Sequence, residues 1–353
     1  MAPSTTKQWT VQGKDGFESL KWDEKAPVPS LGERDVLVKF HAASLNFRDL
    51  AIPKGRYPFP TREGVVPGSD GSGVVEAVGS NVTRFKISSL TSNPDKVATL
   101  FNQGHLAGSL SPASIGTGLG AIIDGALREY GAFDEQGLVH IPSNLDFAEA
   151  STLPCAALTA WNALYGLKPL KPGQTVLTQG TGGVSIFAIQ FAKAAGARVI
   201  ATTSSSEKAD LLKKLGADHV INYKENPNWG EQAQSLSPGG LGVDHVVEVG
   251  GPTTLKQSLV AVKIDGVISI IGFIGGFSKD QPSFLDCLNN LCTVRGLLVG
   301  SRELFEEMNA AIEANDIHPI VDKKRFALPE LKDAYEYMFD QKHFGKLVIK
   351  IAE

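Results

Sequence analysis

From residue 154 onward, short apolar strands alternate with helical segments, and this alternation constrains the fold more than any other feature. Five apolar runs have the length and composition of buried strands: 175–178, 198–202, 219–222, 243–248 and 266–271. Helical patterns at 186–195 and 207–215 each end at a glycine. Apolar strands that alternate with helices form a parallel sheet covered on both faces. The sequence therefore predicts an α/β domain with a Rossmann-type, doubly wound parallel sheet.

The first third of the chain has a different character, because Gly and Pro interrupt short β-rich runs such as 36–42 and 73–78. This punctuation is typical of a small, mostly antiparallel β domain. Residues 86–125 are polar and glycine-rich, and we interpret most of them as a mobile loop. This loop is either a surface insertion or a lid over the substrate.

The end of the chain does not continue the alternation. A helical pattern at 328–339 precedes a strand at 346–351, which we expect to return to the first domain. We therefore expect a β-rich domain over residues 1–135 and 320–353, and a dinucleotide-binding domain over residues 136–319.

Charge and composition favour a small-molecule partner. The 34 basic and 38 acidic residues are scattered, so nothing indicates nucleic acid. The longest apolar stretch, 267–277, is too short to span a bilayer, and the first residues lack the apolar core of a signal peptide. Three cysteines cannot form a disulfide framework. We expect a cytoplasmic protein that does not bind membranes.

A glycine turn follows the first strand of the α/β region. Gly180 and Gly182 fill the first two places of a G-x-G-x-x-G pattern, and Ser185 fills the third. Such a turn lets backbone N–H groups at a helix N-terminus approach a pyrophosphate. The pattern predicts dinucleotide binding, and the alternative is a purely structural turn.

The end of the second strand indicates which dinucleotide binds. NAD-dependent enzymes carry an acidic residue about 20 positions after the first glycine, but residues 202–206 are all Thr or Ser. Glu207 is better explained as the partner of Ser204 in a helix-capping box. The hydroxyls of residues 203–205 and the cation of Lys208 suit a 2′-phosphate, although Lys208 also fits an ordinary surface lysine. NADPH is therefore favoured over NADH.

Motifs along nearly the whole chain resemble one known family. They lie at 44–50, 67–75, 153–161, 180–185, 216–223, 246–251 and 343–346. Together they resemble the medium-chain dehydrogenase/reductase superfamily, and within it the zinc-independent branch around the quinone oxidoreductases. The resemblance implies a GroES-like catalytic domain, a Rossmann domain and a homodimer, in which the strand expected at 294–299 pairs across a two-fold axis in relatives. An insertion at 87–95 departs from the family pattern.

The resemblance also implies a set of residues that bind the cofactor. These are Gly180, Thr181, Gly182, Gly183, Val184, Thr203, Ser204, Ser205, Lys208, Tyr223, Val249, Gly250, Phe273, Ile274, Phe344 and Lys346. Candidates near the nicotinamide of the family are Asn46, Tyr57 and Thr159.

The zinc ligands of the superfamily are largely missing. Catalytic zinc needs three protein ligands and one open position. Asn46 stands where a thiolate is expected, and Ser69-Asp70 replaces a His-Glu pair, which leaves only Cys155. We therefore expect no metal. Without a Lewis acid, hydride transfer to a quinone or an α,β-unsaturated carbonyl is favoured over alcohol oxidation.

Several interpretations of single residues remain open. Tyr57 either donates a proton or hydrogen bond to the acceptor or packs its loop against the cleft. Arg48 and Asp49 are interpreted as a structural ion pair at a helix start rather than as catalysts. Asp70 could act as an acid, but a turn carboxylate that caps nearby N–H groups explains it better. For the whole chain, the alternatives are an alcohol dehydrogenase or aldehyde reductase, a biosynthetic enoyl reductase, and a non-catalytic NADPH-binding sensor.

Overall fold

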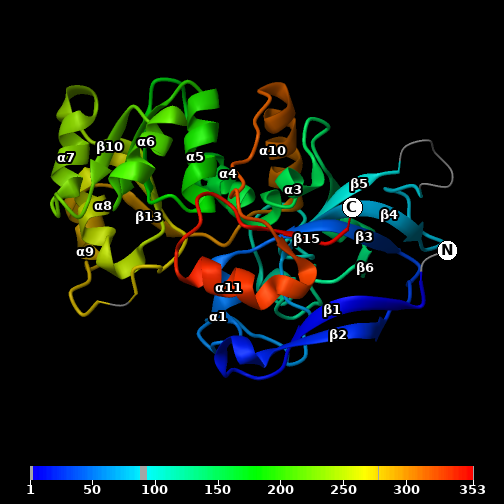
Figure 1. Cartoon of the computed structure of the whole chain (residues 1–353). Helices are drawn as coiled ribbons and strands as arrows, with labels where there is room; N and C mark the ends of the chain where they lie inside the picture. Colours follow the sequence, from blue (N-terminus) through cyan, green and yellow to red (C-terminus); the bar gives the residue numbers. More distant parts are fainter. Residues whose placement is uncertain (1–2, 88–93, 277, 353) are drawn as a thin grey trace. The chain divides into compact units, whose positions relative to one another are not determined.

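The computed structural model describes residues 3–87, 94–276 and 278–352, so residues 88–93 of the expected insertion lie outside it. The chain divides into two compact units (Figure 1). Unit 1 comprises Met1–Leu158 and Gly300–Glu353, and unit 2 comprises Thr159–Val299.

Unit 2 contains a six-stranded sheet in which every neighbouring pair is parallel. Its strand order is β10-β9-β8-β11-β12-β13. The strands are β8 (Thr175–Gln179), β9 (Arg198–Thr203), β10 (His219–Asn222), β11 (Val243–Glu248), β12 (Val262–Ile270) and β13 (Thr293–Gly296). The order reverses after β8, which creates the switch point at which doubly wound sheets bind ligands.

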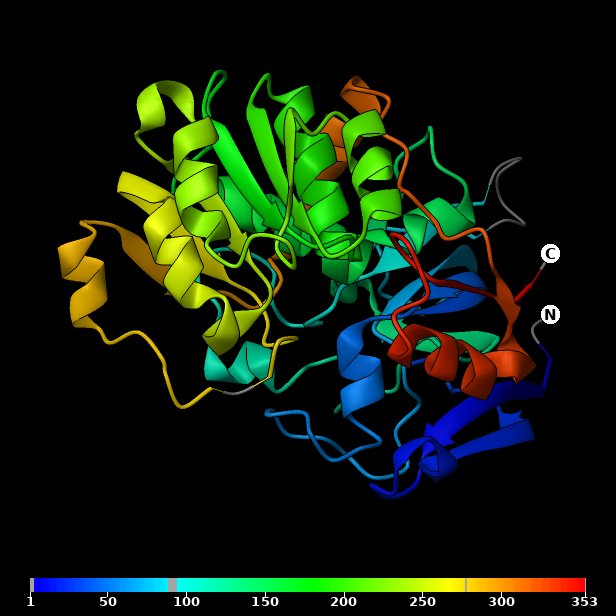
Figure 2. The same ribbon diagram turned by 60° about the vertical axis from the view of Figure 1, so that its left-hand side comes forward.

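Helices connect these strands and cover both faces of the sheet (Figure 2). Helices α5 (Gly183–Ala194), α6 (Ser206–Lys214), α7 (Trp229–Leu236) and α8 (Leu255–Ala261) follow successive strands. Helix α4 (Leu158–Tyr165, whose first residue lies in unit 1) precedes β8, and α9 (Leu285–Asn289), between β12 and β13, has no buried residue. Apolar side chains of the central strands pack with Trp229 and Ala233 of α7 and Leu259 of α8. The Rossmann-type sheet predicted from the alternation is confirmed.

Unit 1 is built on a largely antiparallel sheet of order β14-β15-β3-β4-β5-β7, with β6 also paired to β3 and a separate β1–β2 hairpin. The strands are β1 (Thr5–Val11), β2 (Leu20–Pro27), β3 (Asp35–Ser44), β4 (Asp70–Val78), β5 (Lys96–Thr99), β6 (Tyr130–Asp134), β7 (Leu138–His140), β14 (Phe326–Ala327) and β15 (Val348–Lys350). Strand β15 pairs with β3, Ile349 facing Ala43, so the expected return of the last strand is confirmed.

The helices of unit 1 are short, apart from two near the end of the chain. They are α1 (Phe47–Ala51), α2 (Pro112–Ile115), α3 (Phe147–Ala150), α10 (Arg302–Ala314) and α11 (Leu331–Phe339). Asn309 of α10 donates to the carbonyl of His140 in β7 at 2.8 Å, and β7 in turn pairs with β5. Unit 1 is therefore larger than the expected β-rich domain of 1–135 and 320–353, because residues 136–158 and 300–319 also belong to it.

The interpretation of 86–125 as mostly mobile loop is wrong for much of its described part. Leu119 and Ala121 belong to the hydrophobic core of unit 1. Glycines allow this packing, because a Cβ at Gly125 would lie 2.1 Å from the carbonyl oxygen of Gly68. A Cβ at Gly120 would lie 2.8 Å from the Gly68 nitrogen. The segment lacks a helix or strand period because its backbone packs directly on another backbone.

In the described part of the chain, no helix is both long and apolar enough to cross a membrane.

Candidate functional site

A buried polar network lies in the core of unit 1, where β15, β3 and β4 are neighbours. The register pairs Ser44 with both Val348 and Asp70, which brings the end of β3 next to the residues before β15. The Lys346 ammonium, only 3% exposed, donates to the Leu45 carbonyl at 2.8 Å and to Asn46 Oδ1 at 2.6 Å. It also lies 3.4 Å from Asp70 Oδ2.

The Asp70 carboxylate accepts from several groups in this network. Ser69 Oγ donates to Oδ1 at 2.7 Å, and Ser44 Oγ lies 3.0 Å from Oδ2. Asp70 is therefore held by hydroxyls and an ammonium, and the expectation that it caps turn N–H groups is wrong. A buried carboxylate needs such partners because desolvation penalises its charge.

The network fixes the orientation of the Asn46 amide. An ammonium can only donate, so the amide oxygen faces Lys346, and Nδ2 donates to Ser69 Oγ at 3.3 Å. The amide group carries a second N–H that this contact does not use. Asn46 is also the N-cap of α1, and its backbone N–H donates to Asp49 Oδ2 at 2.8 Å. Desolvation raises the pKa of the buried Asp49 carboxyl to about 6, although Arg48 and this hydrogen bond lower it.

Tyr57 lies beside the network on the loop after α1. Its side chain is half-buried, and desolvation raises the pKa of its phenol. The hydroxyl makes no hydrogen bond with any residue that the structure describes. Arg48 is stacked on aromatic rings, 4.3 Å from the Phe101 centroid and 5.2 Å from the Tyr57 centroid. No hydrogen bond joins Arg48 to Asp49 among the described residues, so the expected structural ion pair is not formed.

The residues at the zinc positions of the superfamily do not fit a catalytic zinc. Asn46 Oδ1 is occupied by the Lys346 ammonium, whose charge would repel a divalent cation. Cys155 is the one thiol at these positions, and a single ligand does not make a catalytic site, which needs three protein ligands. Within residues 3–87, 94–276 and 278–352, no three His, Cys, Asp or Glu side chains form a group that could hold a metal ion.

The glycine turn of unit 2 connects β8 to α5. Gly180 has a φ of 74°, and a Cβ added at Gly180 or Gly182 would have nothing within 4 Å. Gly182 is the N-cap of α5 and offers no side-chain cap, so the first N–H groups of the helix keep no side-chain acceptor there. Ser185, in the third position, is buried and donates to the Gln179 carbonyl at 2.6 Å. The turn therefore fits a pyrophosphate, with Thr181, Gly183 and Val184 lying in the same segment.

The candidates for the adenosine side are brought together at the ends of β9 and β10. The backbone N–H of Tyr223 donates to the Thr203 carbonyl at 3.1 Å. The expected capping box from Ser204 to Glu207 is not formed. The N-cap of α6 is Ser205, whose Oγ accepts from the Lys208 N–H at 3.3 Å, so the helix begins one residue later.

The remaining candidates of unit 2 meet at the ends of β11 and β12. The Ile274 N–H donates to the Val249 carbonyl at 3.1 Å. The N–H of Gly275, which follows Phe273 and Ile274 in the chain, donates to the Gly250 carbonyl at 3.0 Å. Gln179 Oε1 accepts from the N–H groups of Val249 and Gly250, both at 3.1 Å.

Gln179 and Glu248 organise this edge of the sheet, although no sequence motif singles them out. Gln179 Nε2 donates to the fully buried Glu248 at 2.7 Å. The other oxygen of Glu248 accepts from Gly251 N–H at 2.9 Å and from Thr254 Oγ1 at 2.5 Å. The available signal was the position of both side chains at the last residue of a strand in a parallel sheet.

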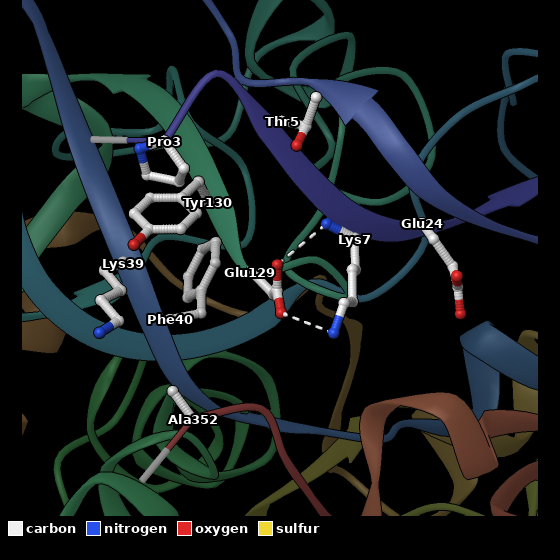
Figure 3. A pocket seen from close by; sticks show the side chains of 9 residues that line it. All are labelled: Pro3, Thr5, Lys7, Glu24, Lys39, Phe40, Glu129, Tyr130 and Ala352. Carbon is white, nitrogen blue, oxygen red and sulfur yellow. Dashed lines mark hydrogen bonds and ion pairs between the residues drawn. The ribbon is translucent and has the colours of Figure 1, made fainter. Parts of the chain in front are cut away.

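Two further candidates are placed individually. Thr159 is buried in the first turn of α4, at the start of unit 2. Phe344, in unit 1, is half-buried, and its N–H donates to Asp322 Oδ2 at 2.8 Å. A separate hollow of about 480 Å³ in unit 1 is lined in part by Lys7 and Glu129 (Figure 3). The Glu129 carboxylate accepts from the Lys7 backbone N–H at 3.0 Å. None of the candidate site residues lines this hollow.

Comparisons with known proteins identify the family. The profile described as alcohol dehydrogenase GroES-like domain matches residues 32–143, and that described as zinc-binding dehydrogenase matches residues 183–314. A zinc-type alcohol dehydrogenase-like protein from Schizosaccharomyces pombe is 48% identical over 341 residues, covering 95% of this chain and 96% of its own. The chain belongs to the medium-chain dehydrogenase/reductase superfamily.

Other members of the superfamily are also similar over nearly the full chain. The NADPH-dependent alkenal/one oxidoreductase of Arabidopsis thaliana is 30% identical, covering 98% of this chain and 80% of its own. The crystal structure of a quinone oxidoreductase from Pseudomonas syringae superposes with a TM-score of 0.81 at 26% identity, covering 98% of this chain and 99% of that one. The chain is thus an oxidoreductase of a superfamily that uses nicotinamide cofactors.

Proposed function

We propose that this chain is a zinc-independent, NADPH-dependent oxidoreductase that transfers hydride to an α,β-unsaturated carbonyl or a quinone. The observation that carries the proposal is the Lys346 ammonium bound to Asn46 Oδ1 at 2.6 Å. The residue expected to align with the thiolate ligand of zinc-dependent relatives is then an amide whose oxygen is already engaged by a fixed cation. The alkenal/one and quinone oxidoreductases among the relatives support the acceptor class.

The proposed cofactor is NADPH. Its pyrophosphate would be held by the turn from Gly180 to Val184, and its 2′-phosphate by Thr203, Ser204, Ser205 and Lys208, since no carboxylate replaces these hydroxyls. When bound, the nicotinamide supplies the hydride.

The residues of unit 1 have to orient the acceptor and stabilise the charge that develops on its oxygen. The N–H of Asn46 that is not used by Ser69 and the phenol of Tyr57 are the candidate donors. The amide cannot rotate without losing its bond from Lys346, so its donor direction is preorganised. The phenol keeps its proton at neutral pH, since desolvation raises its pKa, and it can therefore act as donor.

The test is an NADPH-oxidation screen across quinones, enones, enals and aldehydes, in the presence and absence of a chelator. Reduction of an enone or quinone that chelation leaves unchanged is the expected result. An aldehyde-only activity would favour the alcohol dehydrogenase alternative. Tight NADPH binding with no acceptor turnover would favour the sensor.

The proposed assembly is a homodimer. Strand β13, which begins the segment expected to pair across the two-fold axis, lies at the edge of the unit 2 sheet and is bonded on one side only, to β12, among the described strands. Sedimentation of the purified chain at twice its monomer mass is the expected result.

A further inference from the structure

One buried cation of unit 1 has no part in the proposed reaction. Arg48, two residues after Asn46, is only 7% exposed. Its Nε, Nη1 and Nη2 atoms are all buried, and none of them donates a hydrogen bond to a residue that the structure describes. Buried polar groups in native proteins almost always have hydrogen-bond partners.

The aromatic contacts of Arg48 do not remove this deficit. The faces of Phe101 and Tyr57 attract the positive charge, with ring centroids 4.3 and 5.2 Å from the guanidinium carbon. The five N–H bonds lie in the plane of the guanidinium, however, and need oxygen acceptors at its rim.

Neither of the nearby carboxylates, Asp49 and Asp70, accepts a hydrogen bond from Arg48. Asp70 is held by Ser44, Ser69 and Lys346. Asp49 uses Oδ2 to accept from the Asn46 N–H, and its Oδ1 makes no hydrogen bond within the described part of the chain. Arg48 is thus a buried fork of donors whose acceptor is not supplied by the described part of its own chain.

We propose that Arg48 binds a carboxylate group of the acceptor, so that the substrate is an α,β-unsaturated carbonyl compound that carries a carboxylate. This inference rests on the proposed function of the site. The guanidinium fork matches the two oxygens of a carboxylate. Tyr57, which contacts the guanidinium and whose hydroxyl is bonded to no described residue, then serves the reacting carbonyl of the same molecule. An uncharged acceptor leaves the fork unpaired, which is a strong source of discrimination.

The first test measures binding without turnover. Benzoate serves as a simple carboxylate probe and is titrated into the full-length chain by calorimetry. Arg48→Met, which keeps the length and apolar contacts of the side chain, should weaken benzoate binding roughly 10- to 100-fold. Arg48→Lys, which keeps the charge but not the fork, should lie between. Arg56→Met is the matched control, because Arg56 is exposed on the same loop as Tyr57, and it should change the affinity less than about twofold.

Three outcomes overturn the proposal. They are a wild type that binds no benzoate, an Arg48→Met variant that binds benzoate as tightly as the wild type, and an Arg56→Met variant that loses as much benzoate affinity as Arg48→Met. Thermal unfolding confirms that the variants are folded. Should Arg48→Met not fold, the comparison of Arg48→Lys with Arg56→Met decides in the same way.

The second test uses a matched pair of acceptors, an enone bearing a carboxylate and its methyl ester. Wild type should prefer the carboxylate, and Arg48→Met should lose that preference mainly through a higher KM. An equal fall in kcat for both acceptors would assign Arg48 to the reacting oxygen and overturn the proposal. If wild type reduces neither acceptor nor any compound of the wider screen, the proposed function fails, whereas the benzoate titration still decides whether Arg48 binds carboxylates.

Discussion

Replacing Lys346 by Met should destabilise unit 1 strongly. The change removes the ammonium that faces Asp70 at 3.4 Å and leaves the Asn46 Oδ1 and Leu45 carbonyl without a donor. Lys346 and Asp70 are 3% and 0% exposed, so water does not replace the lost partner. Breaking one side of a buried ion pair costs about 3–5 kcal/mol, and we expect the free energy of unfolding to fall by that amount.

The reciprocal change, Asp70→Asn, should cost a similar amount, because it leaves the ammonium buried without its counter-charge. Combining the two changes removes both charges, so the double variant should lose about 1–3 kcal/mol less than the sum of the single losses. Such a coupling would show that the network acts as a unit.

Urea unfolding followed by circular dichroism measures these losses. Lys342→Met is the control, because Lys342 is paired with Asp340 at 2.7 Å on the exposed surface, and its loss should cost below about 1 kcal/mol. A Lys346→Met loss no larger than that of the control, or strictly additive single losses, would refute the reasoning.

Four further results are expected. Ser205→Asp should weaken NADPH binding by placing a carboxylate near the 2′-phosphate; tighter binding of NADH than of NADPH by wild type would contradict the cofactor proposal. Elemental analysis of the purified protein should find no stoichiometric zinc, and one zinc per chain would contradict the proposal. Tyr57→Phe should lower the single-turnover rate roughly 10²- to 10³-fold with unchanged NADPH affinity, and a rate within about threefold of wild type would leave the phenol without a chemical role. His245 is buried with no hydrogen bond to a described residue, and desolvation, aided by the charges of Lys168, Lys263 and Arg295 and opposed by Asp244, lowers its pKa to about 4. Because the pKa of His245 is lowered in the folded state, the unfolded chain takes up the proton first, and the free energy of unfolding falls as the pH drops from about 6.5 to 4. His245→Leu should remove up to about 3 kcal/mol of this fall. The urea midpoints of the two proteins, compared across that pH range, measure it.

The fold was predictable where local patterns and packing agree. In unit 2, apolar strands and glycine-terminated helices follow directly from the sequence, and the structure confirms the parallel sheet. In unit 1, the segment around Leu119 was misinterpreted, because its order comes from contact between Gly120, Gly125 and the distant Gly68. Contacts between backbones far apart in the sequence leave no periodic signal.

The site was predictable only in part for the same reason. Asn46 and Lys346 were both singled out from motifs, but nothing in the sequence indicated that their side chains bond to each other across 300 positions. The role of Gln179 was missed because a single polar residue at a strand end has many explanations. The unpaired donors of Arg48 likewise emerge only from three-dimensional packing, since the sequence shows an adjacent Asp49 and suggests an ion pair that is not formed.

The discontinuity of unit 1 has a consequence for how the protein is made. Unit 2 is a single continuous segment, Thr159–Val299, and can fold as soon as that segment leaves the ribosome. Unit 1 needs Lys346 and β15, which are synthesised after the whole of unit 2. During synthesis, Asp70 and Asn46 therefore remain without the Lys346 ammonium until the whole of unit 2 has been made. We expect a nascent chain stalled before residue 346 to hold a folded unit 2 and a loosely packed unit 1, so that the pairing of β15 with β3 is a late step of folding.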